Sequence, residues 1–215
     1  MSDIHAYKSD VNNGRYIYIL AGVHGDEVES IYVLKELLAN AELWEKINRP
    51  TIVVPIVNVD GYRIGTRTNS HGVDLNRNLP ASSWSHVITE PQYHPGLTPL
   101  SEPENQFLVS LFQKYPPGIA ISLHSWRPIL NYNGDCIEVA HFLAERNQYP
   151  IAPSIGYATP GSLGDYLPEK YSAPVLTYEL PRIGHLRTLR DVWDENKLAL
   201  TDLLTSDLLN KYCLL

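Results

Sequence analysis

The chain has 215 residues and a net charge of −7, from 17 basic and 24 acidic side chains. A chain of this length falls within the range of one domain, and it can bury about 70% of its unfolded surface without disulfide staples. Runs of Lys or Arg never reach three residues, which argues against a nucleic-acid partner because phosphate contacts need a basic face.

The first half of the chain alternates strand and helix patterns. Residues 16–23 are rich in aromatic and β-branched side chains and predict a buried strand. Apolar side chains at helical spacing predict a helix over residues 30–47. Residues 51–59 predict a second strand, in which Pro55 indicates an irregularity or a sheet edge.

A long segment rich in Gly, Pro, Ser and Asn follows at residues 60–103, and loops of such length usually carry function. Beyond it we expect helices over 103–114, 137–148 and 187–212 and strands over 118–123 and 175–180. Strands that alternate with helices predict a single α/β domain with a sheet covered on both faces. Ligands of such folds collect at the carboxyl ends of the strands.

The N-terminus is polar and lacks the apolar stretch of a signal peptide. The apolar run at residues 16–23 is far shorter than the roughly 20 residues that cross a bilayer. Cys136 and Cys213 fit neither a disulfide framework nor a cysteine-based metal site, and unpaired thiols suit a reducing compartment. If Met1 is the true start, the sequence predicts a cytoplasmic protein without a membrane partner.

The segment His24-Gly25-Asp26-Glu27 comes directly after the first predicted strand. A catalytic zinc site needs three protein ligands and one open position, and zinc accepts imidazole nitrogen and carboxylate oxygen. Gly25 would allow an unusual backbone in such a turn. For this tetrapeptide alone, an equal alternative is a polar loop whose acidic side chains favour a helix N-terminus. His124 also ends a predicted strand, so it strengthens the metal hypothesis for His24 and Glu27.

Glu179 is the candidate general base, because it closes the predicted strand at 175–180. An ionised carboxylate at a buried strand end is costly unless a cation or a reaction uses it. Near a zinc-bound water, such a carboxylate can accept a proton. The alternative is an exposed glutamate that simply precedes Pro181.

Two arginines in the long loop, Arg67 and Arg77, would supply positive charge to the predicted cleft. A guanidinium suits a carboxylate ligand and also stabilises an oxyanion. Asp74 could hold the second nitrogen of a histidine ligand. Without the flanking motifs, salt bridges on a surface loop would be the preferred explanation of these residues.

Taken together, these motifs resemble the zinc metallocarboxypeptidase family, whose order His-x-x-Glu, Arg, Asn-Arg, His, Tyr, Glu runs through residues 24–179. The resemblance implies a central mixed, mostly parallel twisted sheet flanked by helices, with one catalytic domain over residues 1–215. It implies one zinc ion on His24, Glu27 and His124, Arg67 as oxyanion stabiliser, Asn76 and Arg77 on a substrate carboxylate, Tyr157 as mobile capping residue and Glu179 as the base.

The exact residues of these motifs point to one branch of the family. The segments HGDE, GTRTN, GVDLNRN, TPGSLG and ELPR look more like the murein peptide amidases than like digestive carboxypeptidases. Murein peptide amidases hydrolyse the γ-D-glutamyl–meso-diaminopimelate bond of cell-wall peptides during recycling. The implied partner is therefore a small muropeptide, and the implied place of action is the cytoplasm. Arg182 is a candidate contact for a second substrate carboxylate, although Pro181 leaves its direction open.

Three other functions are compatible with the motifs. An ordinary metallocarboxypeptidase would release C-terminal residues, and Gly164, near the place of the family's side-chain preference, sets no rule of size or charge. Deacylases of the aspartoacylase or succinylglutamate desuccinylase type share HGxE and the Asn-Arg pair. An inactive binding module would keep the pocket without the chemistry. The sequence predicts no oligomeric state.

Overall fold

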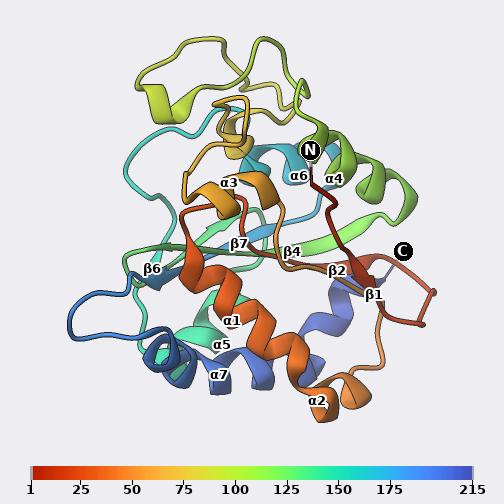
Figure 1. Cartoon of the computed structure of the whole chain (residues 1–215). Coiled ribbons are helices and arrows are strands. Elements are labelled where there is room, and N and C mark those ends of the chain that lie inside the picture. The colour runs from red at the N-terminus through yellow and green to blue at the C-terminus, as the bar shows by residue number, and fades with distance from the viewer. Residues whose placement is uncertain (1, 215) are drawn as a thin grey trace.

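The computed structural model describes residues 2–214, which form one twisted sheet between two layers of helices (Figure 1). The strand order is β1-β3-β2-β4-β7-β5-β6. Strands β3, β2, β4 and β7 run parallel, whereas β1 and β5 are antiparallel to β3 and β7. The strands are β1 (Tyr7–Lys8), β2 (Tyr16–Leu20), β3 (Thr51–Val54), β4 (Pro117–Trp126), β5 (Ile129–Asn133), β6 (Ile151–Ala152) and β7 (Val175–Pro181). The expected mixed, mostly parallel sheet is confirmed.

Helices α1, α2, α5 and α7 lie on one face of the sheet, and α3, α4 and α6 lie on the other with the long loop (Figure 1). Within the described residues, none of them combines the length and the apolar character that a membrane span needs. The helices are α1 (Val28–Ala39), α2 (Ala41–Lys46), α3 (Val59–Ile64), α4 (Pro103–Lys114), α5 (Ile137–Asn147), α6 (Leu163–Tyr171) and α7 (Leu189–Thr205), with 3-10 turns at Leu75–Arg77, Pro91–Tyr93 and Asp207–Cys213.

The sheet separates two apolar cores. Alternate residues of β2 face opposite ways, so Ile17 and Ile19 pack under α1 and α7 whereas Tyr18 and Leu20 pack under α4 and α6. All four are at most 1% exposed. Burial of each such side chain contributes about 1.5–3 kcal/mol, so the central strands are fixed from both sides and their carboxyl ends form a rigid base.

Two predicted helices were too long. The single helix expected over 30–47 is divided at Asn40, whose side chain accepts a hydrogen bond from the backbone nitrogen of Leu43 and caps α2. The closing helix expected over 187–212 ends at Thr205, because the next residue, Ser206, has an extended backbone. Apolar periodicity continues across both breaks, which is why the pattern concealed them.

The second predicted strand was also too long. Strand β3 ends at Val54, directly before Pro55, so the expected irregularity is confirmed. Antiparallel β1 covers β3 on its outer side, so β3 is not the sheet edge. The chain then turns into α3, where Asn58 accepts a hydrogen bond from the nitrogen of Gly61. Five elements were not predicted from the sequence: α3, β1, β5, β6 and α6, of which β1 and β6 have two residues each.

Candidate active site

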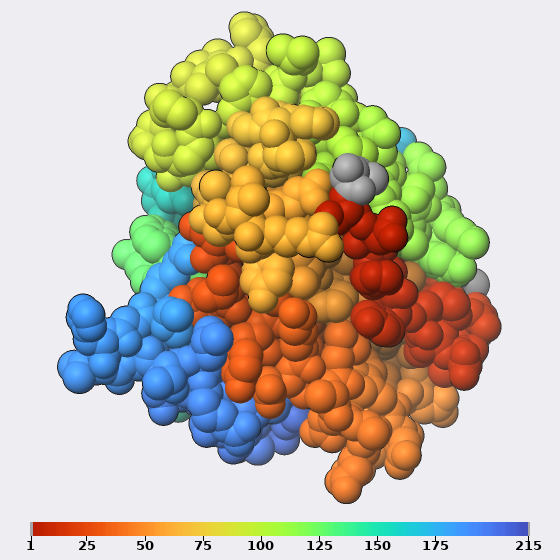
Figure 2. Space-filling view, in the orientation of Figure 1, coloured from red at the N-terminus to blue at the C-terminus, as the bar shows by residue number. Residues whose placement is uncertain are grey.

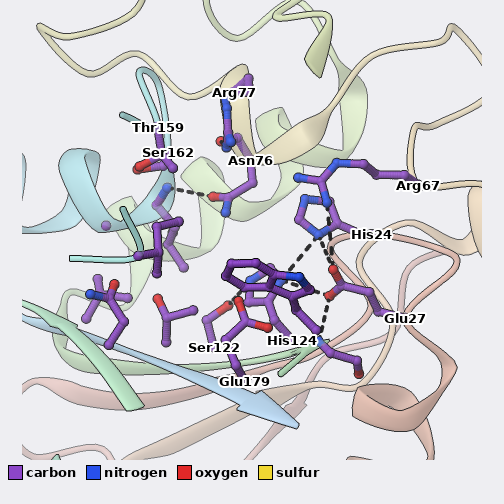
Figure 3. Close-up of a pocket in the computed structure, with 18 of the residues that line it drawn as sticks. His24, Glu27, Arg67, Asn76, Arg77, Ser122, His124, Thr159, Ser162 and Glu179 are labelled. Carbon is purple, nitrogen blue, oxygen red and sulfur yellow. Dashed lines mark hydrogen bonds and ion pairs between the residues drawn. The ribbon is translucent and has the colours of Figure 1, made fainter. Parts of the chain in front are cut away.

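Two neighbouring parallel strands bring the paired histidines together. β2 and β4 are in register over residues 17–20, and both carry the chain to the same edge of the sheet. There, Nδ1 of His24 and Nδ1 of His124 lie 3.3 Å apart. The carboxylate of Glu27 lies between them, at 2.7 Å from the first and 2.9 Å from the second (Figure 3). The expected convergence of the three residues is confirmed.

The second nitrogen of each imidazole has its own partner. Nε2 of His24 lies 3.1 Å from Oδ1 of Asp74, and Nε2 of His124 lies 3.1 Å from Oγ of Ser122. Since the Asp74 carboxylate only accepts, Nε2 of His24 is the donor and a neutral ring has its lone pair on Nδ1. The anticipated contact of Asp74 with a histidine nitrogen is thus present. Ser122 was missed, although it stands two residues before His124 on the same strand face.

Both ring nitrogens of His24 face carboxylate oxygens, so this arrangement requires either a cation in the cluster or a second proton on the imidazole. Although burial opposes both shifts, Glu27 and Asp74 raise the pKa of His24, and the two imidazoles hold the pKa of Glu27 well below its usual range. The ligand atoms of His24, Glu27 and His124 lie within 4.8 Å of one another and are buried. In a tetrahedral zinc site, ligand atoms lie about 3.4 Å apart. The donor set therefore fits zinc.

Gly25 serves close packing rather than an unusual backbone. Its φ angle is not positive, contrary to expectation. A Cβ atom at Gly25 would instead lie 2.1 Å from the carbonyl carbon of Gly61, so only glycine lets α3 approach the turn. The nitrogen of Gly25 also donates to the carbonyl oxygen of Arg67 at 3.4 Å, which ties the turn to the long loop.

Arg67 lies beside the donor cluster. Its Nη2 and Nε donate to Oδ2 of Asp74 at 2.9 and 3.1 Å, and its Nη1 is 3.8 Å from Oε1 of Glu27. Asp74 thus holds both His24 and Arg67 through its two oxygens. The guanidinium presents positive charge at the rim of the cluster, where a developing oxyanion could be stabilised.

Asn76 and Arg77 face the cluster from the opposite side of the pocket (Figure 3). Oδ1 of Asn76 accepts a hydrogen bond from the backbone nitrogen of Leu163 at 2.9 Å, so the amide nitrogen remains free to donate. Arg77 is 5% exposed, and its Nη1 donates to the backbone oxygen of Asn76 at 2.7 Å. It takes part in none of the ion pairs between residues 2–214. A buried guanidinium without an anionic partner is a strong site for a carboxylate.

Tyr93 was not anticipated. The guanidinium carbons of Arg67 and Arg77 lie 5.1 and 5.4 Å from the centre of its ring, so both cations contact one aromatic ring. The residue comes from the loop-rich segment, where no periodic pattern distinguishes it. Its neighbour Tyr157 lies 6.5 Å away between ring centres and is 48% exposed at the pocket mouth, a position that suits a movable cap.

Glu179 lies beside His124, its register partner across the β4–β7 pair. It is 8% exposed, and its Oε2 has no hydrogen-bond partner among the described residues. Burial and the negative charge of Glu27 raise the pKa of Glu179 to about 7, against the lowering effects of His124 and Arg67. Such a carboxylate is poised to exchange a proton near neutral pH.

Arg182 also reaches the pocket, from just beyond β7. Its guanidinium donates to the backbone oxygen of Asp26 at 2.6 Å and to the carboxylate of Asp26 at 3.2 Å. Glu29 lies 3.8 Å away. Arg182 is thus already paired, and its contact with a second substrate carboxylate stays a prediction.

Comparison with known families agrees with this geometry. The zinc carboxypeptidase family model matches residues 3–191. The chain therefore belongs to the zinc carboxypeptidase family, and it is a metallopeptidase of the hydrolase class.

Two similar proteins within this family are both murein peptide amidases. Murein peptide amidase A of Escherichia coli strain K12 is 35% identical over 183 residues, which cover 77% of this chain and 71% of that protein. Murein peptide amidase A of Vibrio campbellii is 32% identical over 177 residues, with 77% and 69% covered.

Solved structures extend the comparison to the fold. Murein-tripeptide amidase from Escherichia coli O157 superposes with a TM-score of 0.79 at 30% identity, covering 94% of this chain and 86% of that one. Bovine thrombin-activatable fibrinolysis inhibitor, in complex with a tick carboxypeptidase inhibitor, gives a TM-score of 0.75 at 19% identity, covering 96% and 91%. The second match shows the shared fold alone.

Proposed function

We propose that this protein is a murein peptide amidase that hydrolyses the γ-D-glutamyl–meso-diaminopimelate bond of small muropeptides in the cytoplasm. The supporting observation for the chemistry is the unpartnered, buried Oε2 of Glu179 beside a cluster of two imidazoles and one carboxylate. The support for the substrate is the similarity to amidases named for murein peptides.

His24, Glu27 and His124 are the proposed ligands of one zinc ion. When bound, zinc supplies Lewis-acid polarisation of the scissile carbonyl and lowers the pKa of a water molecule toward about 7. Asp74 and Ser122 orient the two imidazoles through their second nitrogens.

Glu179 is the proposed proton carrier. It accepts the proton of the attacking water and then gives it to the nitrogen of the leaving amine, which lets the carbon–nitrogen bond break. Its raised pKa suits both directions of transfer. Arg67, held by Asp74, donates hydrogen bonds to the oxyanion that forms on the scissile carbonyl.

Asn76 and Arg77 are the proposed binding groups for the carboxylate of the leaving residue. The free amide nitrogen of Asn76 and the unpaired guanidinium of Arg77 can both donate to it. Tyr157 would close over the bound peptide from the mouth of the pocket. This grip fixes the scissile bond against the cluster, and such positioning lowers the barrier.

Product analysis separates this proposal from its rivals. The enzyme is incubated with L-alanyl-γ-D-glutamyl-meso-diaminopimelate, with an α-linked peptide and with an N-acyl amino acid, each with and without a chelator, and products are identified by mass. We expect free diaminopimelate only from the first, and only without chelator. Preferred release of the α-linked C-terminal residue would identify a carboxypeptidase, and preferred hydrolysis of the N-acyl amino acid would identify a deacylase.

A further inference from the structure

Helix α1 begins at one of the candidate metal ligands. Its N-cap residue is Glu27, and the side chain of Glu27 makes no capping hydrogen bond to the helix. The carboxylate lies instead between His24 and His124, at 2.7 and 2.9 Å from their Nδ1 atoms. Backbone nitrogens in the first turn of a helix have no partner within the helix, so α1 needs an acceptor from elsewhere.

Ser125 supplies this acceptor from the end of strand β4. Its Oγ accepts a hydrogen bond at 3.1 Å from the backbone nitrogen of Ser30, a residue in the first turn of α1 and 95 positions away in the chain. Four other helices are capped by the side chain of the residue that directly precedes them, namely Asn40, Asn58, Ser162 and Thr188. In α1, the residue in that position directs its carboxylate to the cluster, and a distant hydroxyl takes over the capping.

Ser125 also holds Glu27 by two routes. The backbone nitrogen of Ser125 donates to Oε2 of Glu27 at 3.2 Å, which orients the carboxylate. Oγ of Ser30, whose backbone nitrogen is bound to Ser125, donates to the backbone oxygen of Glu27 at 2.8 Å. The three residues therefore form a closed ring of hydrogen bonds that fixes both the side chain and the backbone of Glu27.

Burial and strand geometry keep this ring in place. Ser30 and Ser125 are both 0% exposed, so loss of the Ser125 hydroxyl would leave the backbone nitrogen of Ser30 buried without a partner. Side chains alternate along β4. His124 therefore faces the pocket, whereas Ser125 shares a strand face with Leu123, which packs in the core under α1. Two consecutive residues of β4 thus support one cluster from opposite faces of the sheet.

We propose that Ser125 is a positioning residue that holds Glu27 in place for zinc. Its hydroxyl fixes the first turn of α1 and its backbone nitrogen orients the carboxylate, while neither group needs to touch the ion. Contacts of this kind change metal affinity by about 10–100-fold. This inference rests on the proposed zinc ligands but not on the proposed substrate, because zinc binding is measured without a peptide.

The affinity of Ser125→Ala for zinc tests this role. The Kd is measured on the purified full chain by competition with a chelator of known affinity. We expect the variant to bind zinc about tenfold more weakly, or weaker still, because the turn that carries Glu27 loses its acceptor. Cobalt(II) provides a second readout, since its visible spectrum reports the geometry of its ligands. We expect this spectrum to change in Ser125→Ala.

Thr188→Ala is the matched control. The hydroxyl of Thr188 caps α7, and the residue is exposed and is not part of the pocket lining. Both variants should have a lower Tm, because each loses a helix cap, but Thr188→Ala should keep the zinc affinity and the cobalt spectrum. If Ser125→Ala does not fold, Ser30→Ala breaks the route to the backbone of Glu27 and should weaken zinc binding relative to Thr188→Ala.

The outcomes separate this inference from the proposed function. Equal zinc affinities in Ser125→Ala and Thr188→Ala would overturn the role of Ser125 while the zinc site and the amidase function stood. If the protein binds zinc but hydrolyses only α-linked peptides, the proposed substrate fails and the zinc affinities still test Ser125. If the unmodified protein binds zinc no better than His24→Ala, the zinc site fails and this inference fails with it.

Discussion

At the scale of single residues, the most informative atom is Oε2 of Glu179, which is buried without a partner among the described residues. Proteins seldom leave a carboxylate oxygen in this state, because desolvation raises its free energy. Here the cost is consistent with a reactive role, since the same burial raises the pKa of Glu179 to about 7.

Replacement of this carboxylate tests the role directly. We expect Glu179→Gln to keep its fold and bound zinc but to lose about 10²–10⁴-fold in kcat, the usual contribution of a general base. Kinetics and elemental analysis of the purified variant provide the measurement, and Glu145→Gln on the exposed surface of α5 is the control. Activity near that of the unmodified enzyme would remove Glu179 from the mechanism.

At the scale of elements, the start of α4 anchors the catalytic loop. Nδ2 of Asn69 donates to the carboxylates of Glu102 and Glu104 at 2.7 and 3.2 Å. The amide oxygen of Asn69 in turn accepts from the nitrogens of His71 and Val73, just before Asp74 in the loop. Two buried carboxylates therefore fix the segment that holds His24 and Arg67 in place.

This anchor predicts a dependence of stability on pH. Burial, with the neighbouring charge of Glu102, raises the pKa of Glu104 in the folded state. The folded protein therefore binds this proton more tightly than the unfolded chain, so stability decreases as pH rises through the raised pKa. Glu104→Gln removes this loss while its carbonyl oxygen can still accept from Asn69.

We expect Glu104→Gln to be more stable than the unmodified protein at neutral pH, and the difference to vanish as pH falls below the ordinary glutamate pKa of about 4.3. Urea unfolding from pH 4 to 8 measures it. Glu45→Gln, exposed on α2, is the matched control and should show no such trend. A variant that is less stable at neutral pH would contradict the assignment.

At the scale of the whole molecule, the site joins segments that are distant along the chain. Figure 2 shows that the surface is built from interleaved parts of the sequence, with the loop-rich segment around residues 75–100 capping one side. The proposed zinc ligands come from the turn after β2 and from β4, which are 100 residues apart. An ion bound there would cross-link both halves of the sheet in the folded state only.

Metal removal should therefore lower thermal stability. A ligand that binds only the folded state adds about 4 kcal/mol to the free energy of unfolding when its concentration is 1,000 times its Kd. For a domain of this size, each kcal/mol raises Tm by about 2–4 °C. We expect chelation to lower Tm by about 8–16 °C, one zinc per chain to restore it, and His24→Ala to abolish the difference. A Tm that is indifferent to zinc would count against the metal site.

Much of the site could be predicted from the sequence, and the exceptions have physical causes. Apolar strands end at or just before four of the polar residues, so the sequence pattern predicted that their side chains converge. These residues are His24, Glu27, His124 and Glu179. Tyr93 was not predictable, because it lies in an irregular loop and gains its place through two distant arginines. Strand β5 was not predicted because it mixes polar and apolar residues.

The sequence by itself determined the α/β class, the central strands and the identity of the metal-binding candidates, because apolar periodicity and strand-end polar residues are local signals. Only the tertiary structure decided where helices break, which imidazole nitrogen faces the cluster and which side chains line the pocket. Those features depend on strand register and on hydrogen bonds between residues far apart in the chain, and no local pattern encodes either.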